Sequence, residues 1–138
     1  MTDPSLLLVE DNPDDIALAQ RAVTRGGVRA NLVVARSGKE AWDLLHASVR
    51  LKQRPKAVFL DLNMPEWSGF DLLERVRASS NIASIPMIVL TTSSEPADVE
   101  RSYRLGANSF VTKPLDFKKF ADVFATMSVY WAGINETA

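Results

Sequence analysis

Short apolar segments alternate with amphipathic segments along almost the whole chain. Segments 6–9, 57–60 and 86–90 are almost continuously apolar, which is typical of strands covered on both faces. Segment 31–35 is predicted to be another strand, and segment 109–112 the last and most polar one. Because strands that alternate with helices are typical of repeated βα units, this pattern predicts a parallel sheet of five strands with five helices.

The first helix carries a clear start signal. Asn12 is expected to cap it, with Pro13 as its first residue, because a capping side chain and an N-terminal proline both suit this position. Asp14 and Asp15 follow in the first turn, where the helix dipole favours negative charge. The dipole is the preferred explanation for this acidic pair, and metal binding is the second choice.

The last helix is predicted to begin at Asp116 and to continue until Gly133 ends it. One apolar stripe at helical spacing is assigned to the domain core. The helix remains apolar towards its end, which favours a homodimer formed through the fourth and fifth helices or through the C-terminal arm. The stripe consists of Phe120, Phe124, Met127 and Trp131.

The length of 138 residues, with 46% hydrophobic and 24% charged residues, is typical of one globular domain. We expect residues 1–138 to form this domain, with a core of about 4–128 and a C-terminal helical extension. A formal net charge of −1 gives no support for binding to nucleic acid or to a membrane. The sequence contains no cysteine, no signal-peptide pattern and no apolar stretch long enough to span a bilayer. A cytoplasmic location is therefore expected.

Five polar residues stand at the carboxyl ends of the apolar segments. They are Glu10, Asp11, Asp61, Thr91 and Lys113. In an open parallel sheet, ligands bind outside the carboxyl ends of the strands. If the segments are neighbouring parallel strands, these five side chains therefore meet at one edge of the sheet.

The three carboxylates need a positive counter-charge. Two unit charges about 4 Å apart repel each other by roughly 4 kcal/mol at an effective dielectric of about 20. Mg²⁺ prefers carboxylate, carbonyl and water oxygens, and Lys113 adds a further positive charge. Each acid taken alone could simply cap the helix after its strand. Three acids, a hydroxyl and a lysine converging from four strands instead indicate a metal-assisted phosphoryl site with an aspartate as acceptor.

In the order and spacing of these residues, the chain resembles the receiver domains of response regulators, the CheY-like phosphoacceptors. The acidic pair comes first; Asp61 precedes Thr91 by 91 − 61 = 30 residues, and Thr91 precedes Lys113 by 113 − 91 = 22 residues. The segment from Gly106 to Pro114 is especially characteristic. This resemblance covers nearly the whole chain and implies a flavodoxin-like, doubly wound sheet of strand order 2-1-3-4-5.

The resemblance also implies a role for each residue of the site. Asp61 is similar to the phosphoacceptor, and Asp11 and Asp61 would bind Mg²⁺ directly. Glu10 would bind it through water, and the backbone carbonyl of Asn63 would be a further ligand. Lys113 would offset charge on the phosphoryl group, since catalysis of such transfers is mostly positioning and electrostatics.

Two residues correspond to the family's switch positions. Thr91 would donate a hydrogen bond to a phosphoryl oxygen, and Phe110 would turn inward as Thr91 moves. Phe110 is equally well explained as ordinary core. The bond between Lys113 and Pro114 is an X–Pro bond, and the sequence leaves its cis or trans state open.

The resemblance implies a sensor histidine kinase as the phosphoryl donor. The opening segment 9–15 and the basic loop 50–56 resemble a narrower subgroup, the single-domain regulators paired with bacterial phytochrome kinases. The downstream target and the phosphoryl lifetime are not determined by the sequence.

Two other functions compete with this hypothesis. A phosphatase of the haloacid-dehalogenase type also uses an aspartyl nucleophile, but it needs a second Asp two positions later, where this chain has Asn63. A receiver-like interaction module without phosphorylation is opposed by the complete set of acid, hydroxyl and lysine groups. The favoured interpretation is a self-phosphorylating switch rather than an enzyme with a separate substrate.

Overall fold

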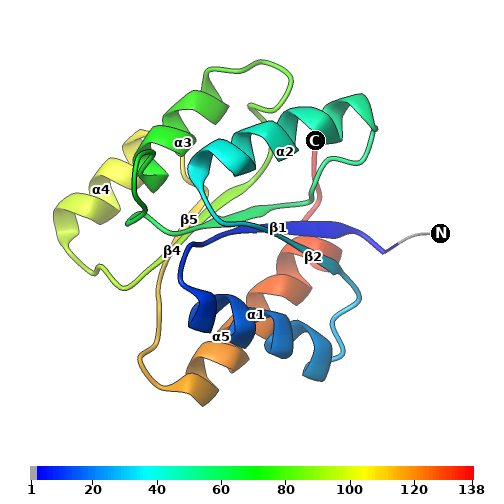
Figure 1. The fold of residues 1–138 in the computed structure, drawn as a ribbon, viewed down its shortest axis with the longest axis vertical. Coiled ribbons are helices and arrows are strands. Elements are labelled where there is room, and N and C mark those ends of the chain that lie inside the picture. Colours follow the sequence, from blue (N-terminus) through cyan, green and yellow to red (C-terminus); the bar gives the residue numbers. More distant parts are fainter. Residues whose placement is uncertain (1–2) are drawn as a thin grey trace.

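The computed structural model describes residues 3–138 and contains a five-stranded parallel sheet between two layers of helices (Figure 1). The strand order is 2-1-3-4-5, which confirms the predicted doubly wound, flavodoxin-like topology. The strands are β1 (Ser5–Val9), β2 (Asn31–Ala35), β3 (Val58–Leu60), β4 (Met87–Thr91) and β5 (Ser109–Thr112). The helices are α1 (Pro13–Arg25), α2 (Gly38–Arg50), α3 (Gly69–Arg77), α4 (Pro96–Arg104) and α5 (Phe117–Val129).

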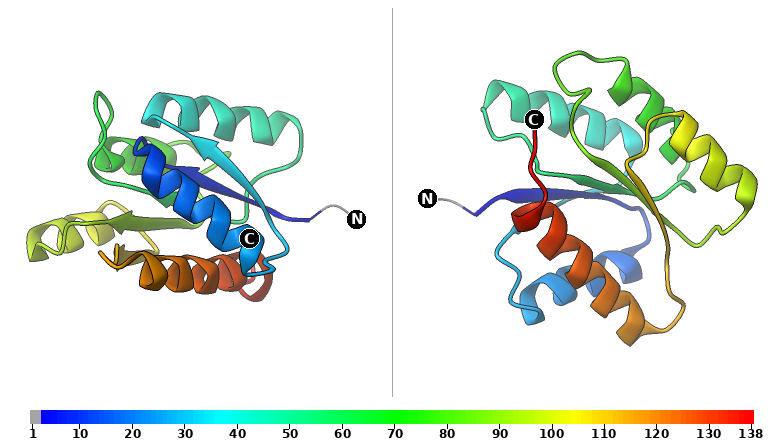
Figure 2. Two further views of the ribbon diagram at one scale, coloured as in Figure 1. Left: turned by 60° about the horizontal axis from the view of Figure 1, so that its bottom comes forward. Right: turned by 180° about the vertical axis from the view of Figure 1, so that it is seen from behind.

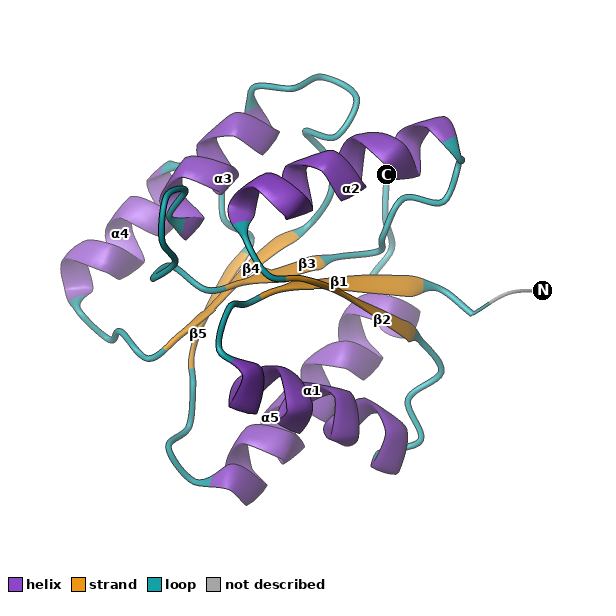
Figure 3. Cartoon of the chain, viewed as in Figure 1, coloured by secondary structure: helices purple, strands orange, loops and turns teal. Residues whose placement is uncertain are grey.

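The apolar strands are covered on both faces, as their sequence predicts. Helices α2, α3 and α4 lie on one face of the sheet, and α1 and α5 lie on the other (Figure 3). Strand β1 divides its side chains accordingly: Leu7 and Val9 pack with α2 and α3, whereas Leu6 and Leu8 pack with α1 and α5. Period-two alternation along a strand thus produces two separate cores from one apolar segment.

The C-terminal part of α5 differs from the prediction in one respect. The stripe is core, because Phe120, Phe124 and Met127 are buried and Trp131 packs against them. Gly133, however, does not end the helix. A π-helical turn, η1 (Tyr130–Ile134), continues through it and closes with the Asn135 N–H donating to the Tyr130 carbonyl at 2.7 Å. The prediction was wrong here because Gly133 lacks the positive φ of a helix-ending glycine.

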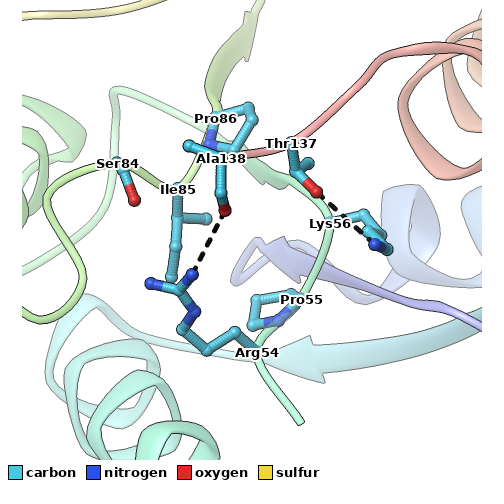
Figure 4. A pocket seen from close by; sticks show the side chains of 8 residues that line it. All are labelled: Arg54, Pro55, Lys56, Ser84, Ile85, Pro86, Thr137 and Ala138. Atoms are coloured by element: carbon cyan, nitrogen blue, oxygen red, sulfur yellow. Dashed lines mark hydrogen bonds between the residues drawn. The ribbon is translucent and has the colours of Figure 1, made fainter. Parts of the chain in front are cut away.

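Beyond η1 the chain runs past the end of the sheet, as the rear view in Figure 2 shows. There Arg54 donates to the Ala138 carbonyl at 3.4 Å, and Lys56 donates to the Thr137 hydroxyl at 3.4 Å (Figure 4). These groups line a cavity of about 230 Å³ together with Ser84. Since Lys56 lies just before β3, this cavity is at the amino ends of the strands, opposite the edge where the sequence predicts the site.

Arg77 links the end of α3 to the two loops that lead into β4 and β5. From the last position of α3, its guanidinium donates to the carbonyls of Ala83 at 2.7 Å, Ile85 at 2.8 Å and Gly106 at 2.9 Å. It also donates to the Asn108 side chain at 2.7 Å, which accepts the N–H of Met87 as well. Burial lowers the pKa of Arg77. One side chain thereby fixes the connections that enter β4 and β5.

Within residues 3–138, none of the helices combines the length and the hydropathy that crossing a bilayer requires.

Candidate functional site

The carboxyl ends of β1, β3, β4 and β5 bring the predicted residues to one edge of the sheet. Parallel pairing aligns Val9, at the end of β1, with Leu60, at the end of β3, and these residues are followed directly by Glu10 and Asp61. Thr91 is the last residue of β4, and Lys113 follows β5, with the Lys113 N–H donating to the Thr91 carbonyl at 2.6 Å. The convergence expected from the sequence is therefore present.

Lys113 lies at the centre of the site. Its Nζ donates to Glu10 Oε1, to Asp15 Oδ2 at 2.9 Å and to Asp61 Oδ2 at 3.3 Å. Lys113, Glu10 and Asp61 are all buried, with relative exposures of 6%, 2% and 8%. A buried ammonium surrounded in this way keeps its charge and fixes the positions of the carboxylates.

The pKa values of the central pair reflect opposing effects. Burial alone lowers the pKa of Lys113, but its hydrogen bonds to Glu10 and Asp15 and the charges of Asp61 and Glu10 outweigh it, so the pKa of Lys113 is raised. Burial also raises the pKa of Glu10, and the Asp61 charge adds to this effect, while the contact with Lys113 opposes it. The raised pKa of Lys113 favours its charged form.

Carboxylate oxygens of Glu10, Asp11 and Asp61 lie within 4.8 Å of one another. This hard oxygen donor set fits Mg²⁺. The two oxygens of Glu10 already have partners: Oε1 accepts from Lys113, and Oε2 accepts the N–H groups of Asp11 at 3.1 Å and Asn12 at 3.2 Å. Asp11 is exposed and is open to a ligand from outside.

The loop after β3 is held close to the Asp61 side chain. The Asn63 N–H donates to Asp61 Oδ1 at 3.3 Å. Gly69, the first residue of α3, lies against the same loop: a Cβ at Gly69 would overlap the Asp61 carbonyl and approach Leu62 Cα to 2.8 Å. Glycine is therefore required where α3 packs against the backbone of Asp61.

We expect Gly69→Ala to destabilise the fold by about 2 kcal/mol, because the added methyl meets backbone atoms that cannot rotate away. Gly133→Ala is the matched control, since nothing lies within 4 Å of a Cβ at Gly133; its effect should stay within about 0.5 kcal/mol. Urea denaturation measures both changes. Equal stability of the two variants would contradict the packing explanation.

The two predicted switch positions lie on neighbouring strands. The Thr91 side chain is fully buried, and its Oγ1 accepts the Ser93 N–H at 3.4 Å. Phe110 is partly buried against the core between the sheet and α2–α3, and its N–H donates to the Tyr103 hydroxyl of α4 at 3.1 Å. The Lys113–Pro114 peptide bond is trans.

Asp15 is a site residue whose contact with Lys113 the sequence did not predict. The sequence favours the helix dipole as the explanation of this acid, with metal binding as the second choice, yet the Asp15 carboxylate contacts Lys113. Asn12 caps α1 by accepting the N–H groups of Asp14 and Asp15. The signal in the sequence that could have indicated this contact is the second acid of the pair, Asp15, because the first turn of α1 comes soon after Glu10 and Asp11.

Comparison with known proteins agrees with this geometry. The "probable methanogenesis regulatory protein FilR2" of Methanothrix harundinacea is 35% identical over 133 residues, which are 96% of this chain and 86% of that protein. The crystal structure of the phosphorylated cyanobacterial phytochrome response regulator RcpA matches with a TM-score of 0.90 and 29% identity over 99% of both chains. That of Mn²⁺-bound response regulator Rcp1 matches with a TM-score of 0.86 and 28% identity, covering 98% of this chain and 99% of that one.

The family model of the response regulator receiver domain matches residues 6–125. This match covers most of the chain, and its boundaries include all five residues that the sequence places at the carboxyl ends of the strands. The chain therefore belongs to the family of response regulator receiver domains.

Proposed function

We propose that this chain is a phosphoacceptor of two-component signalling, in which Asp61 accepts a phosphoryl group from a phosphohistidine of a sensor histidine kinase. The observation that supports this most directly is the set of contacts around Asp61: a buried lysine at 3.3 Å and two further acids within 4.8 Å. In this proposal residues 1–138 act as one receiver domain, with a core of about 4–128 and a C-terminal helical extension.

The transfer exchanges one bond to phosphorus for another. A carboxylate oxygen of Asp61 forms the new O–P bond while the P–N bond of the phosphohistidine breaks, and the imidazole nitrogen keeps the electron pair. Water later attacks phosphorus and restores the carboxylate of Asp61. Lys113 remains charged throughout and offsets the charge on the phosphoryl oxygens. The chain modifies only itself, so it is a switch rather than an enzyme with a separate substrate.

Mg²⁺ fits the acidic residues of this site. Asp11 and Asp61 would hold it directly, Glu10 through water, and Asn63 through its backbone carbonyl. The existing contacts of both Glu10 oxygens support an indirect role for that residue. When bound, the ion supplies a second positive charge next to the transferring group.

Thr91 and Phe110 are proposed to convert phosphorylation into a change of surface. The buried Thr91 hydroxyl, whose oxygen accepts the Ser93 N–H in this structure, would donate a hydrogen bond to a phosphoryl oxygen. Phe110 would then turn further inward, which shifts the population of arrangements of α4 and β5.

The proposed kinase needs a surface beside Asp61. Leu115 and Phe117, which follow Lys113, are 89% and 73% exposed. Apolar side chains so exposed at the rim of a site suit docking of a partner helix. Similarity to the phytochrome regulator RcpA supports a phytochrome-type kinase as that partner. In this proposal the chain acts in the cytoplasm.

We also propose that the chain forms a homodimer through α4 and α5 or through the C-terminal arm. Tyr103, Val129, Tyr130 and Ile134 are large hydrophobic residues with exposures of 44–61% on these elements. A surface of this kind is commonly covered by another subunit.

The proposal predicts one acyl phosphate on the chain. Incubation with phosphoramidate and Mg²⁺ should give a single phosphoryl adduct in the intact mass, and removal of Mg²⁺ with EDTA should suppress it. Borohydride reduces an aspartyl phosphate to homoserine, so peptide mapping should find homoserine at position 61. An adduct that maps to another residue, or no adduct with any phosphodonor, would refute the proposal.

A further inference from the structure

Asp14 and Asp15 are adjacent acids in the first turn of α1, but they have different surroundings. Asp14 is exposed, and among residues 3–138 no hydrogen bond joins its carboxylate to another side chain. The Asp15 side chain is only 26% exposed and accepts a hydrogen bond from Lys113 Nζ at 2.9 Å, a shorter distance than the 3.3 Å from Nζ to Asp61. The helix dipole favours both acids equally, so it does not explain the contact of Asp15.

The ammonium group of Lys113 has three hydrogen-bond donors. In this structure three carboxylates, those of Glu10, Asp15 and Asp61, accept from it. A phosphoryl oxygen on Asp61 would be a fourth acceptor for the same three donors. One of the present contacts must therefore break before Lys113 can bind the phosphoryl group.

The three carboxylates differ in how easily they can leave Lys113. Glu10 is 2% exposed and is also fixed by the N–H groups of Asp11 and Asn12. Asp61 carries the phosphoryl group itself. Asp15 is the most exposed of the three. Water can therefore hydrate its carboxylate after the contact with Lys113 breaks, and the free-energy cost of breaking that contact is the smallest of the three.

We infer that Asp15 is a positioning residue that holds Lys113 in the unphosphorylated state and competes with the phosphoryl group for it. This inference rests on the proposed phosphorylation of Asp61. Asp15 opposes the phosphorylated state in two ways: it occupies a donor of Lys113, and its negative charge, in contact with the same ammonium group, repels phosphoryl oxygens that bind there. Asp15 thereby lowers the fraction of the chain that is phosphorylated at a given supply of donor.

The test compares Asp15→Asn with Asp14→Asn, which removes one charge from the same helical turn without touching Lys113. The probe is beryllofluoride, a phosphoryl mimic, titrated in saturating Mg²⁺. We expect Asp15→Asn to bind it about fivefold more tightly than the parent, and Asp14→Asn to stay within about twofold. Asp15→Glu, which retains the charge, should return the affinity towards that of the parent.

A second measurement needs neither metal nor mimic. In NMR spectra of the side-chain ammonium groups, the Lys113 signal should shift in Asp15→Asn and remain in place in Asp14→Asn. A purely structural role of Asp15 would lower the thermal stability of Asp15→Asn but leave its affinity for beryllofluoride equal to that of the parent.

The outcomes separate the two proposals. If the parent accepts phosphate on Asp61 but Asp15→Asn binds beryllofluoride no more tightly than Asp14→Asn, only the role of Asp15 is refuted. If the parent neither accepts phosphate nor binds the mimic, the proposed function fails, and the role of Asp15 fails with it.

Discussion

Replacing Asp61 by asparagine is expected to abolish the phosphoryl adduct completely. The amide has nearly the same shape as the carboxylate, but its nitrogen lone pair is delocalised and its oxygen carries no full charge, so it cannot act as the nucleophile. Intact-mass measurement after incubation with phosphoramidate and Mg²⁺ should show the adduct in the parent and none in Asp61→Asn.

This loss is not expected to come from unfolding. Asp61 is one of several acids around a single lysine, and Lys113 keeps Glu10 and Asp15 as partners when Asp61 becomes neutral. Circular dichroism should therefore show a folded variant. Asp43→Asn is the control for charge alone, because Asp43 forms an exposed pair with Lys39 at 2.9 Å, away from the site. An adduct on Asp61→Asn as abundant as on Asp43→Asn would place the acceptor elsewhere.

Arg77→Ala should have the largest effect on stability, lowering the free energy of unfolding by about 3 kcal/mol. The substitution leaves the carbonyls of Ala83, Ile85 and Gly106 without the Arg77 donor and removes one of the two donors to the Asn108 side chain. Part of the cost is recovered where water can reach these groups. Urea denaturation measures the change: the midpoint concentration should fall while the m-value, the dependence of the unfolding free energy on urea, stays the same.

Arg75→Ala provides a matched comparison one half-turn earlier in α3. The Arg75 guanidinium lies over the Trp67 ring at 4.0 Å and is exposed, so its loss should cost about 1 kcal/mol or less. If Arg75→Ala and Arg77→Ala had equal effects, the hydrogen bonds of Arg77 would not explain its contribution.

The sheet and its site could be predicted from the sequence because their signals are local. A continuously apolar segment such as 6–9 predicts a strand covered on both faces, and the polar residue after each strand must lie at the carboxyl edge once the strands are parallel. The site of Glu10, Asp61 and Lys113 follows from these two rules together with the resemblance to receiver domains.

The contacts that the sequence did not predict depend on which elements face each other. Asp15 has a sufficient local explanation in the helix dipole, and Arg77 has one too, as a basic residue in the last turn of α3. Neither explanation shows that Asp15 meets Lys113, 98 residues away, or that Arg77 meets Asn108, 31 residues away. Gly133 failed as a predicted stop because glycine only permits a left-handed turn and does not impose one.

The hydrogen bond between the Phe110 N–H and the Tyr103 hydroxyl also bears on self-association of the protein. β5 forms one border of the sheet and β2 the other, and unpaired N–H groups along such a border can template strand addition by another chain. In β5, which has four residues, the Tyr103 hydroxyl already occupies the Phe110 N–H. Intermolecular sheet growth, the first step towards aggregates, is therefore disfavoured at the β5 border.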